Sequence, residues 1–118
     1  FGGSKAPRYI SWSSENRSQL IRIPAAQGEY RRAELRSPDP LCNPYLAFTL
    51  LIRAGLCGIR EGLSLPQPAD FNLFSAPAAV LADYAVLPQS REEAGRCAAG
   101  DPFLAASLPH SVIRLYTA

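Results

Sequence analysis

The sequence predicts an α+β fold, in which a short antiparallel sheet comes before a helical C-terminal half. Residues 8–36 alternate β-prone and polar side chains in three short runs, which is typical of strands. From residue 45 the apolar side chains recur every three or four residues instead, which is the period of an α-helix. A chain of 118 residues forms one domain at most. We therefore expect strands over about 8–36 and helices over about 43–118.

The predicted strands cover residues 8–13, 19–23 and 30–36. The first and third alternate polar and β-prone side chains, and the second is a short apolar run that Pro24 stops. Polar turns separate the three runs, and these links are too short to hold a crossover helix. Antiparallel pairing is therefore expected throughout the sheet.

The strongest helix signal begins at Asn43-Pro44, where asparagine is a good cap and proline suits the first helical position. The pattern continues to about Gly62. Its apolar stripe is broad, so we expect this helix to be mostly buried. The residues of the stripe are Tyr45, Phe48, Ile52, Leu56, Ile59 and Leu63.

Four shorter helices are predicted in the last third of the chain. The first covers 77–84 and is a weak signal. Ser90 and Glu93 have the spacing of a capping box and open a second helix, which Gly100 ends. Asp101-Pro102 begins a third helix through residue 108, and residues 110–116 form the last turns.

Composition limits what the chain can be. The net charge is +2, with 47% apolar and 19% charged residues, which excludes collagen-like, coiled-coil and highly charged disordered proteins. No apolar stretch reaches the roughly 18 residues of a membrane span, so we expect no membrane partner. The chain begins with Phe and contains no Met, so we expect a piece of a longer protein.

The basic residues are unevenly placed and are almost all arginine. Eleven of the twelve are Arg, and residues 5–36 carry seven basic but only three acidic side chains. A positive cluster in one third of the chain indicates an anionic partner there, and Arg suits carboxylate or phosphate groups. A GC-rich genome would also favour Arg over Lys.

The cysteines and the histidine indicate no metal chemistry. Cys42, Cys57 and Cys97 show no Cys-x-x-Cys spacing, and His110 is the only histidine, so we expect no zinc site. Free thiols in a reducing cytosol are the simplest interpretation, which predicts a cytoplasmic protein. His110 lacks a visible relay partner, and we interpret it as structural.

A candidate site lies on the third predicted strand. With a period of two, Arg32, Glu34 and Arg36 point to the same face. A carboxylate between two guanidinium groups stays ionised and could bind a hard cation. From the spacing alone, a solvated strand face with cross-strand ion pairs is the more common interpretation, because such pairs are frequent on protein surfaces.

Arg17 and Arg22 flank the second predicted strand. Their odd separation puts them on opposite faces of a regular strand, so they share one site only if Arg17 lies in the turn before it. Together they indicate an anion, although surface solubility would also explain them. No Gly-rich nucleotide loop and no nucleic-acid-binding module is present, so we expect no nucleic-acid partner.

Several motifs in sequence resemble one known family. They are Ala6-Pro7-Arg8-Tyr9-Ile10-Ser11-Trp12, Asn16-Arg17-Ser18-Gln19-Leu20-Ile21-Arg22-Ile23-Pro24, Arg31-Arg32-Ala33-Glu34-Leu35-Arg36-Ser37-Pro38-Asp39-Pro40, Asn43-Pro44-Tyr45-Leu46-Ala47 and Ala54-Gly55-Leu56-Cys57-Gly58-Ile59. Their order and spacing resemble the C-terminal part of the catalytic domain of prokaryotic-type glutamine synthetase. The resemblance covers essentially residues 1–118, most sharply 5–62.

This resemblance implies an ATP-dependent ligase that joins ammonia to the γ-carboxyl of glutamate through γ-glutamyl phosphate, with Mg²⁺ or Mn²⁺. It implies that Arg17 contacts the ATP phosphates and the substrate carboxyl, that Arg22 holds phosphate and that Arg32 lies beside the site. Glu34 would bind one divalent cation, and Arg36 would bind glutamate or the phosphate formed on it. The resemblance also implies that the family's remaining metal ligands lie upstream of these residues, and that the full-length protein forms a homo-oligomer of dodecamer type. We therefore expect the chain alone to be inactive.

Three departures from the family pattern bear on function. Lys5 stands where a glutamate of the family helps to take a proton from ammonium, and lysine cannot attract a cation. A γ-glutamyl ligase for another amine and a non-catalytic paralogue therefore stay open. The loop 25–30 lacks a nucleotide-contacting lysine, and Phe74 replaces a tyrosine that is adenylylated in some members, so we expect that regulation to be absent.

Overall fold

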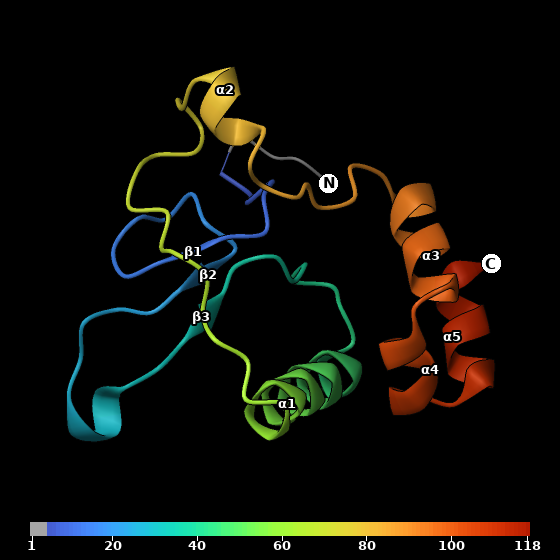
Figure 1. Ribbon diagram of the computed structural model, residues 1–118. Helices are drawn as coiled ribbons and strands as arrows, with labels where there is room; N and C mark the ends of the chain where they lie inside the picture. The colour runs from blue at the N-terminus through green and yellow to red at the C-terminus, as the bar shows by residue number, and fades with distance from the viewer. Residues whose placement is uncertain (1–4) are drawn as a thin grey trace. The chain divides into compact units, whose positions relative to one another are not determined.

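The computed structural model in Figure 1 describes residues 5–118. The chain divides into two compact units. The first consists of the residues up to Pro38 together with Pro66–Leu87, and it contains the sheet. The second consists of Asp39–Leu65 and Pro88–Ala118, and it contains the long helix and the three C-terminal helices.

The sheet has three strands of two residues each, in the order β1-β2-β3 (Figure 1). They are β1 (Trp12–Ser13), β2 (Ile21–Arg22) and β3 (Glu34–Leu35). β2 and β3 pair antiparallel, as predicted, and Arg22 lies opposite Glu34. The α+β fold, with a small sheet followed by helices, is therefore confirmed, although each strand is shorter than its predicted range.

The prediction of antiparallel pairing is wrong for β1 and β2, which run parallel. Ile21 donates its amide hydrogen to the Ser11 carbonyl at 3.1 Å, and Ile23 donates to the Ser13 carbonyl at 2.9 Å. A two-residue strand is only about 7 Å long, so the loop 14–20 can return to the start of the strand without a helix. The prediction assumed strands long enough to need a crossover.

The interior of the first unit is mostly polar. Gln19 and Ser13 are fully buried and Ser18 is 2% exposed, whereas Ala69 and Leu73 are the only buried hydrophobic residues in the part of the chain that the structure describes. Main-chain bonds such as Ala69 N–H to the Trp12 carbonyl (2.8 Å) hold segment 66–73 against β1. This unit also contains a 3₁₀ turn, η1 (Gly28–Tyr30), and the short helix α2 (Ala78–Leu81).

The long helix α1 (Pro44–Arg60) begins and ends as the sequence predicts. The Asn43 Oδ1 atom accepts hydrogen bonds from the Tyr45 and Leu46 amides. At the other end Gly62 has φ +62°, and Leu63 N–H donates to the Gly58 carbonyl at 3.0 Å. This pair of features is a Schellman motif, in which glycine takes a left-handed conformation that other residues resist.

The expectation that α1 is mostly buried is wrong for this structure. None of its residues is buried, and Tyr45 and Ile59 are 83% and 77% exposed. Helix α4 packs on α1 in the second unit, but the apolar stripe stays open to solvent. A helical period identifies which face is apolar, but it cannot tell what covers that face.

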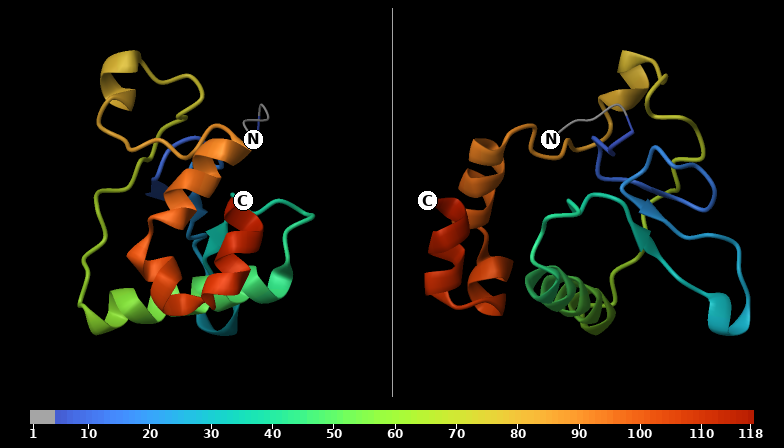
Figure 2. Two further views of the ribbon diagram at one scale, coloured as in Figure 1. Left: turned by 90° about the vertical axis from the view of Figure 1, so that its right-hand side faces the viewer. Right: turned by 180° about the vertical axis from the view of Figure 1, so that it is seen from behind.

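The C-terminal helices are α3 (Arg91–Ala99), α4 (Pro102–Ser107) and α5 (His110–Thr117). Their predicted caps are confirmed: the Ser90 Oγ accepts from Glu93 N–H at 3.1 Å, and the Asp101 Oδ1 accepts from Phe103 N–H at 2.7 Å. Helices α3 and α5 run side by side (Figure 2). None of the helices in residues 5–118 is long and apolar enough to span a membrane.

Candidate anion and cation site

Glu34 and Arg22 form a cross-strand ion pair on the sheet. Because they are register partners in β3 and β2, their side chains are immediate neighbours on one face. The Arg22 Nη1 donates to both Glu34 carboxylate oxygens, at 3.0 and 2.9 Å. The Arg22 side chain is 18% exposed and the Glu34 side chain is 33% exposed, so the pair is partly shielded from water.

Arg32 approaches the same carboxylate from two residues earlier in the chain. Its Nε donates to the Glu34 Oε1 at 3.2 Å, and its Nη2 forms an ion pair with the same oxygen at 3.1 Å. The hydrogen bond from Arg22 has the largest effect and lowers the pKa of Glu34; partial burial raises the pKa, the charge of Arg22 lowers it, and Arg32 lowers it further. Glu34 is therefore fully ionised at neutral pH, as a metal ligand must be.

Glu34 can supply one ligand to a cation, but the described chain does not complete a metal site. An ionised carboxylate has about four lone-pair sites, so an oxygen that accepts from arginine can still bind a metal. However, residues 5–118 contain no cluster of three or more His, Cys, Asp or Glu side chains that could hold an ion. Further ligands would have to come from other residues.

Arg36 lies in the same unit but does not join the Glu34 cluster. Its amide donates to the Leu20 carbonyl at 2.9 Å, which fixes its backbone beside β2. The Nη2 donates weakly to the Lys5 carbonyl at 3.5 Å, whereas the Nη1 is buried without a hydrogen-bond partner in the described chain. An unpaired buried guanidinium nitrogen is costly, and an anionic ligand would satisfy it.

Arg17 lies in the turn before β2, which is the placement that sharing a site with Arg22 requires. Its side chain is exposed. Hydrogen bonds join the two neighbours of Arg17 in the sequence. The Asn16 Oδ1 accepts from the amide and from the hydroxyl of Ser18, at 2.9 and 2.8 Å. Arg17 is thus an exposed cation on an ordered loop.

The structure brings together three of the five predicted residues, namely Arg22, Arg32 and Glu34. Arg17 and Arg36 form no ion pair with Glu34 within residues 5–118. The sequence did not reveal the buried polar side chains around the Arg17 loop. Polar residues between two strands are read as an exposed turn, and only long-range packing shows that Ser18 and Gln19 are buried.

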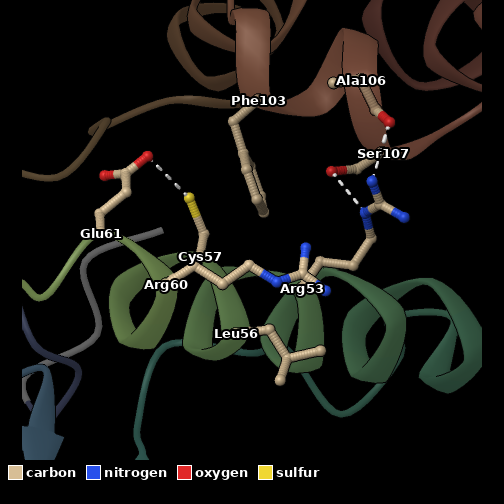
Figure 3. Close-up of a pocket in the computed structure, with 8 residues that line it drawn as sticks. All are labelled: Arg53, Leu56, Cys57, Arg60, Glu61, Phe103, Ala106 and Ser107. Carbon is tan, nitrogen blue, oxygen red and sulfur yellow. Dashed lines mark hydrogen bonds between the residues drawn. The ribbon is translucent and has the colours of Figure 1, made fainter.

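A separate groove of about 390 Å³ lies between α1 and α4 in the second unit (Figure 3). Arg53 reaches across to α4 and donates to the Ser107 Oγ and the Ala106 carbonyl, both at 3.1 Å. The Cys57 thiol donates to the Glu61 Oε1 at 3.2 Å, and this bond raises the pKa of Cys57. A thiol held protonated is a poor nucleophile, so the groove offers no evident chemistry.

A small sheet that presents several arginines and one ionised carboxylate defines a domain suited to binding anionic groups together with a cation. The family model described as "Glutamine synthetase, catalytic domain" matches residues 1–118. The chain belongs to the glutamine synthetase family.

Curated relatives agree with this assignment. The glutamine synthetase of Methanosarcina mazei is 58% identical over 72 residues, and that of Thermotoga maritima is 54% identical over 72 residues. Each alignment covers 61% of this chain and 16% of the relative, so the chain spans a small part of their length. A solved structure of a GmaS/ADP complex superposes with a TM-score of 0.80 at 29% identity, covering 97% of this chain and 25% of that one.

Proposed function

We propose that residues 1–118 are the C-terminal portion of the catalytic domain of a full-length glutamine synthetase. In that protein the reaction is the ATP-dependent ligation of ammonia to the γ-carboxyl of glutamate, through γ-glutamyl phosphate. The family match along the chain supports this function. The observation that carries it is the Glu34 carboxylate, which forms ion pairs with Arg22 and Arg32 on the sheet and whose pKa these arginines lower.

Each candidate residue has a role that suits phosphoryl transfer, which depends on positioning and charge neutralisation more than on covalent chemistry. Arg17, exposed on its ordered loop, contacts the ATP phosphates and the substrate carboxyl. Arg22 holds phosphate through its Nη2, which has no hydrogen bond to another described residue. Arg32 adds positive charge beside them, and the buried Nη1 of Arg36 binds glutamate or the transferred phosphoryl group.

Glu34 contributes one ligand to a Mg²⁺ or Mn²⁺ ion, whose charge neutralises the phosphate oxygens when it is bound. The remaining ligands come from residues outside this chain, since residues 5–118 lack a complete set. The assembly that the family resemblance implies for the full-length protein is a cytoplasmic homo-oligomer of dodecamer type. The free thiols of Cys42, Cys57 and Cys97 suit a reducing compartment.

The assay is phosphate release by the full-length protein with ATP, Mg²⁺, glutamate and a panel of amines. Ammonium is the amine expected to support the fastest release, with glutamine as the product. The matched control omits glutamate and should release no phosphate above background. An absence of release with every amine tested would contradict the proposal.

Lys5 favours a second candidate, a γ-glutamyl ligase that uses another amine. Lys5 is exposed, and its carbonyl accepts a hydrogen bond from the Arg36 Nη2. The backbone of a cationic residue therefore lies next to Arg36, which we propose binds substrate. A positive charge there would repel ammonium but would tolerate an amine that arrives uncharged. Faster release with a weakly basic aromatic amine, which is largely uncharged at neutral pH, than with ammonium would support this candidate. Binding of ATP and glutamate without turnover would instead indicate a non-catalytic paralogue.

A further inference from the structure

We propose that Gln19 is a positioning residue, which fixes the loop that carries Arg17 onto segment 69–73. This inference rests on the proposed function, because it concerns how Arg17 is held where phosphate binds. Gln19 is fully buried, although it lies only two residues from the exposed Arg17. A long polar side chain is rarely buried unless all of its hydrogen-bonding groups have partners.

The carboxamide of Gln19 meets that condition. Its Nε2 donates to the Ala69 carbonyl and to the Phe71 carbonyl, the latter at 2.9 Å. Its Oε1 lies 3.0 Å from the Ser18 hydroxyl, whose single hydrogen is shared between this oxygen and the Asn16 Oδ1. Two main-chain carbonyls can only accept, so the amide orientation is fixed. The side chain therefore joins two segments that are fifty residues apart in sequence.

Ser18 completes the attachment. Its Oγ accepts a hydrogen bond from Leu73 N–H at 2.8 Å, and Leu73 is 2% exposed. Residues immediately after Arg17 are thus anchored through both a main-chain donor and two main-chain acceptors of segment 69–73. The guanidinium of Arg17 is free to meet a ligand while the backbone beneath it is held.

This arrangement matters because catalysis is sensitive to small displacements. A shift of about 1 Å in a charged group can reduce the rate about 100-fold, even when the altered residue is remote from the chemistry. Without the Gln19 carboxamide, the Ala69 and Phe71 carbonyls lose this donor and the loop loses two of its hydrogen bonds to segment 69–73. Arg17 would then spend less time where the phosphates bind.

The test is a double-mutant cycle in the full-length protein, with ATP-dependent glutamine formation as the readout. Gln19→Met keeps the length of the side chain but removes the donor and the acceptor. We expect about a 10- to 100-fold loss of kcat/KM for ATP. In an Arg17→Ala background the same change should cost less than about 2-fold, because Gln19 acts through Arg17.

Trp12→Phe is the matched control. It removes the 2.7 Å hydrogen bond from the Trp12 Nε1 to the carbonyl of Pro66, which lies three residues before segment 69–73. It should lower the melting temperature while leaving kcat/KM within about 3-fold, which is small beside the loss expected from a misplaced charge. If Gln19→Met does not fold, Ser18→Ala, a smaller change to the same attachment, takes its place in the cycle.

Equal losses from Gln19→Met in the wild-type and Arg17→Ala backgrounds would overturn the inference and leave the proposed function intact. So would a loss of kcat/KM in Trp12→Phe as large as in Gln19→Met. A wild-type protein that ligates no amine to glutamate would overturn both the inference and the proposed function.

Discussion

Two arginines that reach Glu34 by different routes lower its pKa. Arg22 contacts Glu34 from the neighbouring strand, because the two are register partners. Arg32 contacts Glu34 from two residues earlier in the sequence. Both stabilise the ionised form, so the pKa of Glu34 lies below its usual value of 4.5. The carboxylate thus remains available to a cation at any pH near neutrality.

A lowered pKa predicts how stability changes with acid. The ion pairs of Glu34 stabilise the folded state fully above its usual pKa of 4.5, and this contribution is lost as the pH falls below that value through the folded-state pKa. Glu34→Gln removes the titration. In thermal unfolding between pH 6 and pH 3, we expect the melting temperature of the wild type to fall more steeply than that of the variant. Parallel curves would contradict this account.

Arg36 should contribute more to glutamate binding than the exposed Arg31 does. Arg36→Gln removes the buried, unpaired Nη1, and a hydrogen bond to a charged group is worth about 1.5–3 kcal/mol, so we expect about a 10- to 100-fold lower kcat/KM for glutamate. Arg31→Gln is the control, since Arg31 is exposed and should change kcat/KM little. Steady-state kinetics of the full-length protein measure both, and equal values for the two variants would refute the role of Arg36.

The sequence predicted part of this site. A period of two correctly placed Arg32 beside Glu34, because that relation is local. The role of Arg22 as the main partner of Glu34 depends on the register between two strands, which alternation alone does not fix. The burial of Gln19 depends on a segment fifty residues away, so no local pattern could indicate it.

At the scale of elements, one glycine inside α1 and one just after its C-terminal end provide a test with opposite signs. Gly62→Ala forces alanine into φ +62° in open space, so we expect a loss of about 1–2 kcal/mol from conformation alone. Gly55→Ala lies inside the helix with no atom within 4 Å of the new Cβ, so we expect a gain of about 1 kcal/mol. Urea unfolding measures both, and a shift of the same sign in the two variants would contradict the account.

Helix boundaries were predictable because caps act through neighbours. Asn43, Ser90 and Asp101 each accept from amides two or three residues ahead, and sequence displays such pairs directly. The parallel pairing of β1 and β2 was not predictable in this way. It depends on how far each strand extends, and alternation overestimated that length.

At the scale of the whole molecule, the chain buries little apolar surface. Only Ala69 and Leu73 are buried hydrophobic residues among those described, while the apolar stripe of α1 is open. We expect the isolated 118-residue chain to show no ATP-dependent ligation of glutamate. The check is the phosphate-release assay on the purified chain beside the full-length protein, and robust turnover by the chain alone would refute this expectation.

The most direct test of the central claim is a calorimetric titration of the full-length protein with ATP in the presence of Mg²⁺, comparing the wild type with Arg17→Ala. The account predicts saturable binding to the wild type and about 10- to 100-fold weaker binding to the variant, the loss expected for one charged hydrogen bond. Equal affinity of ATP for the two proteins, or no binding of ATP to the wild type, would contradict the assignment of Arg17 to a phosphate site.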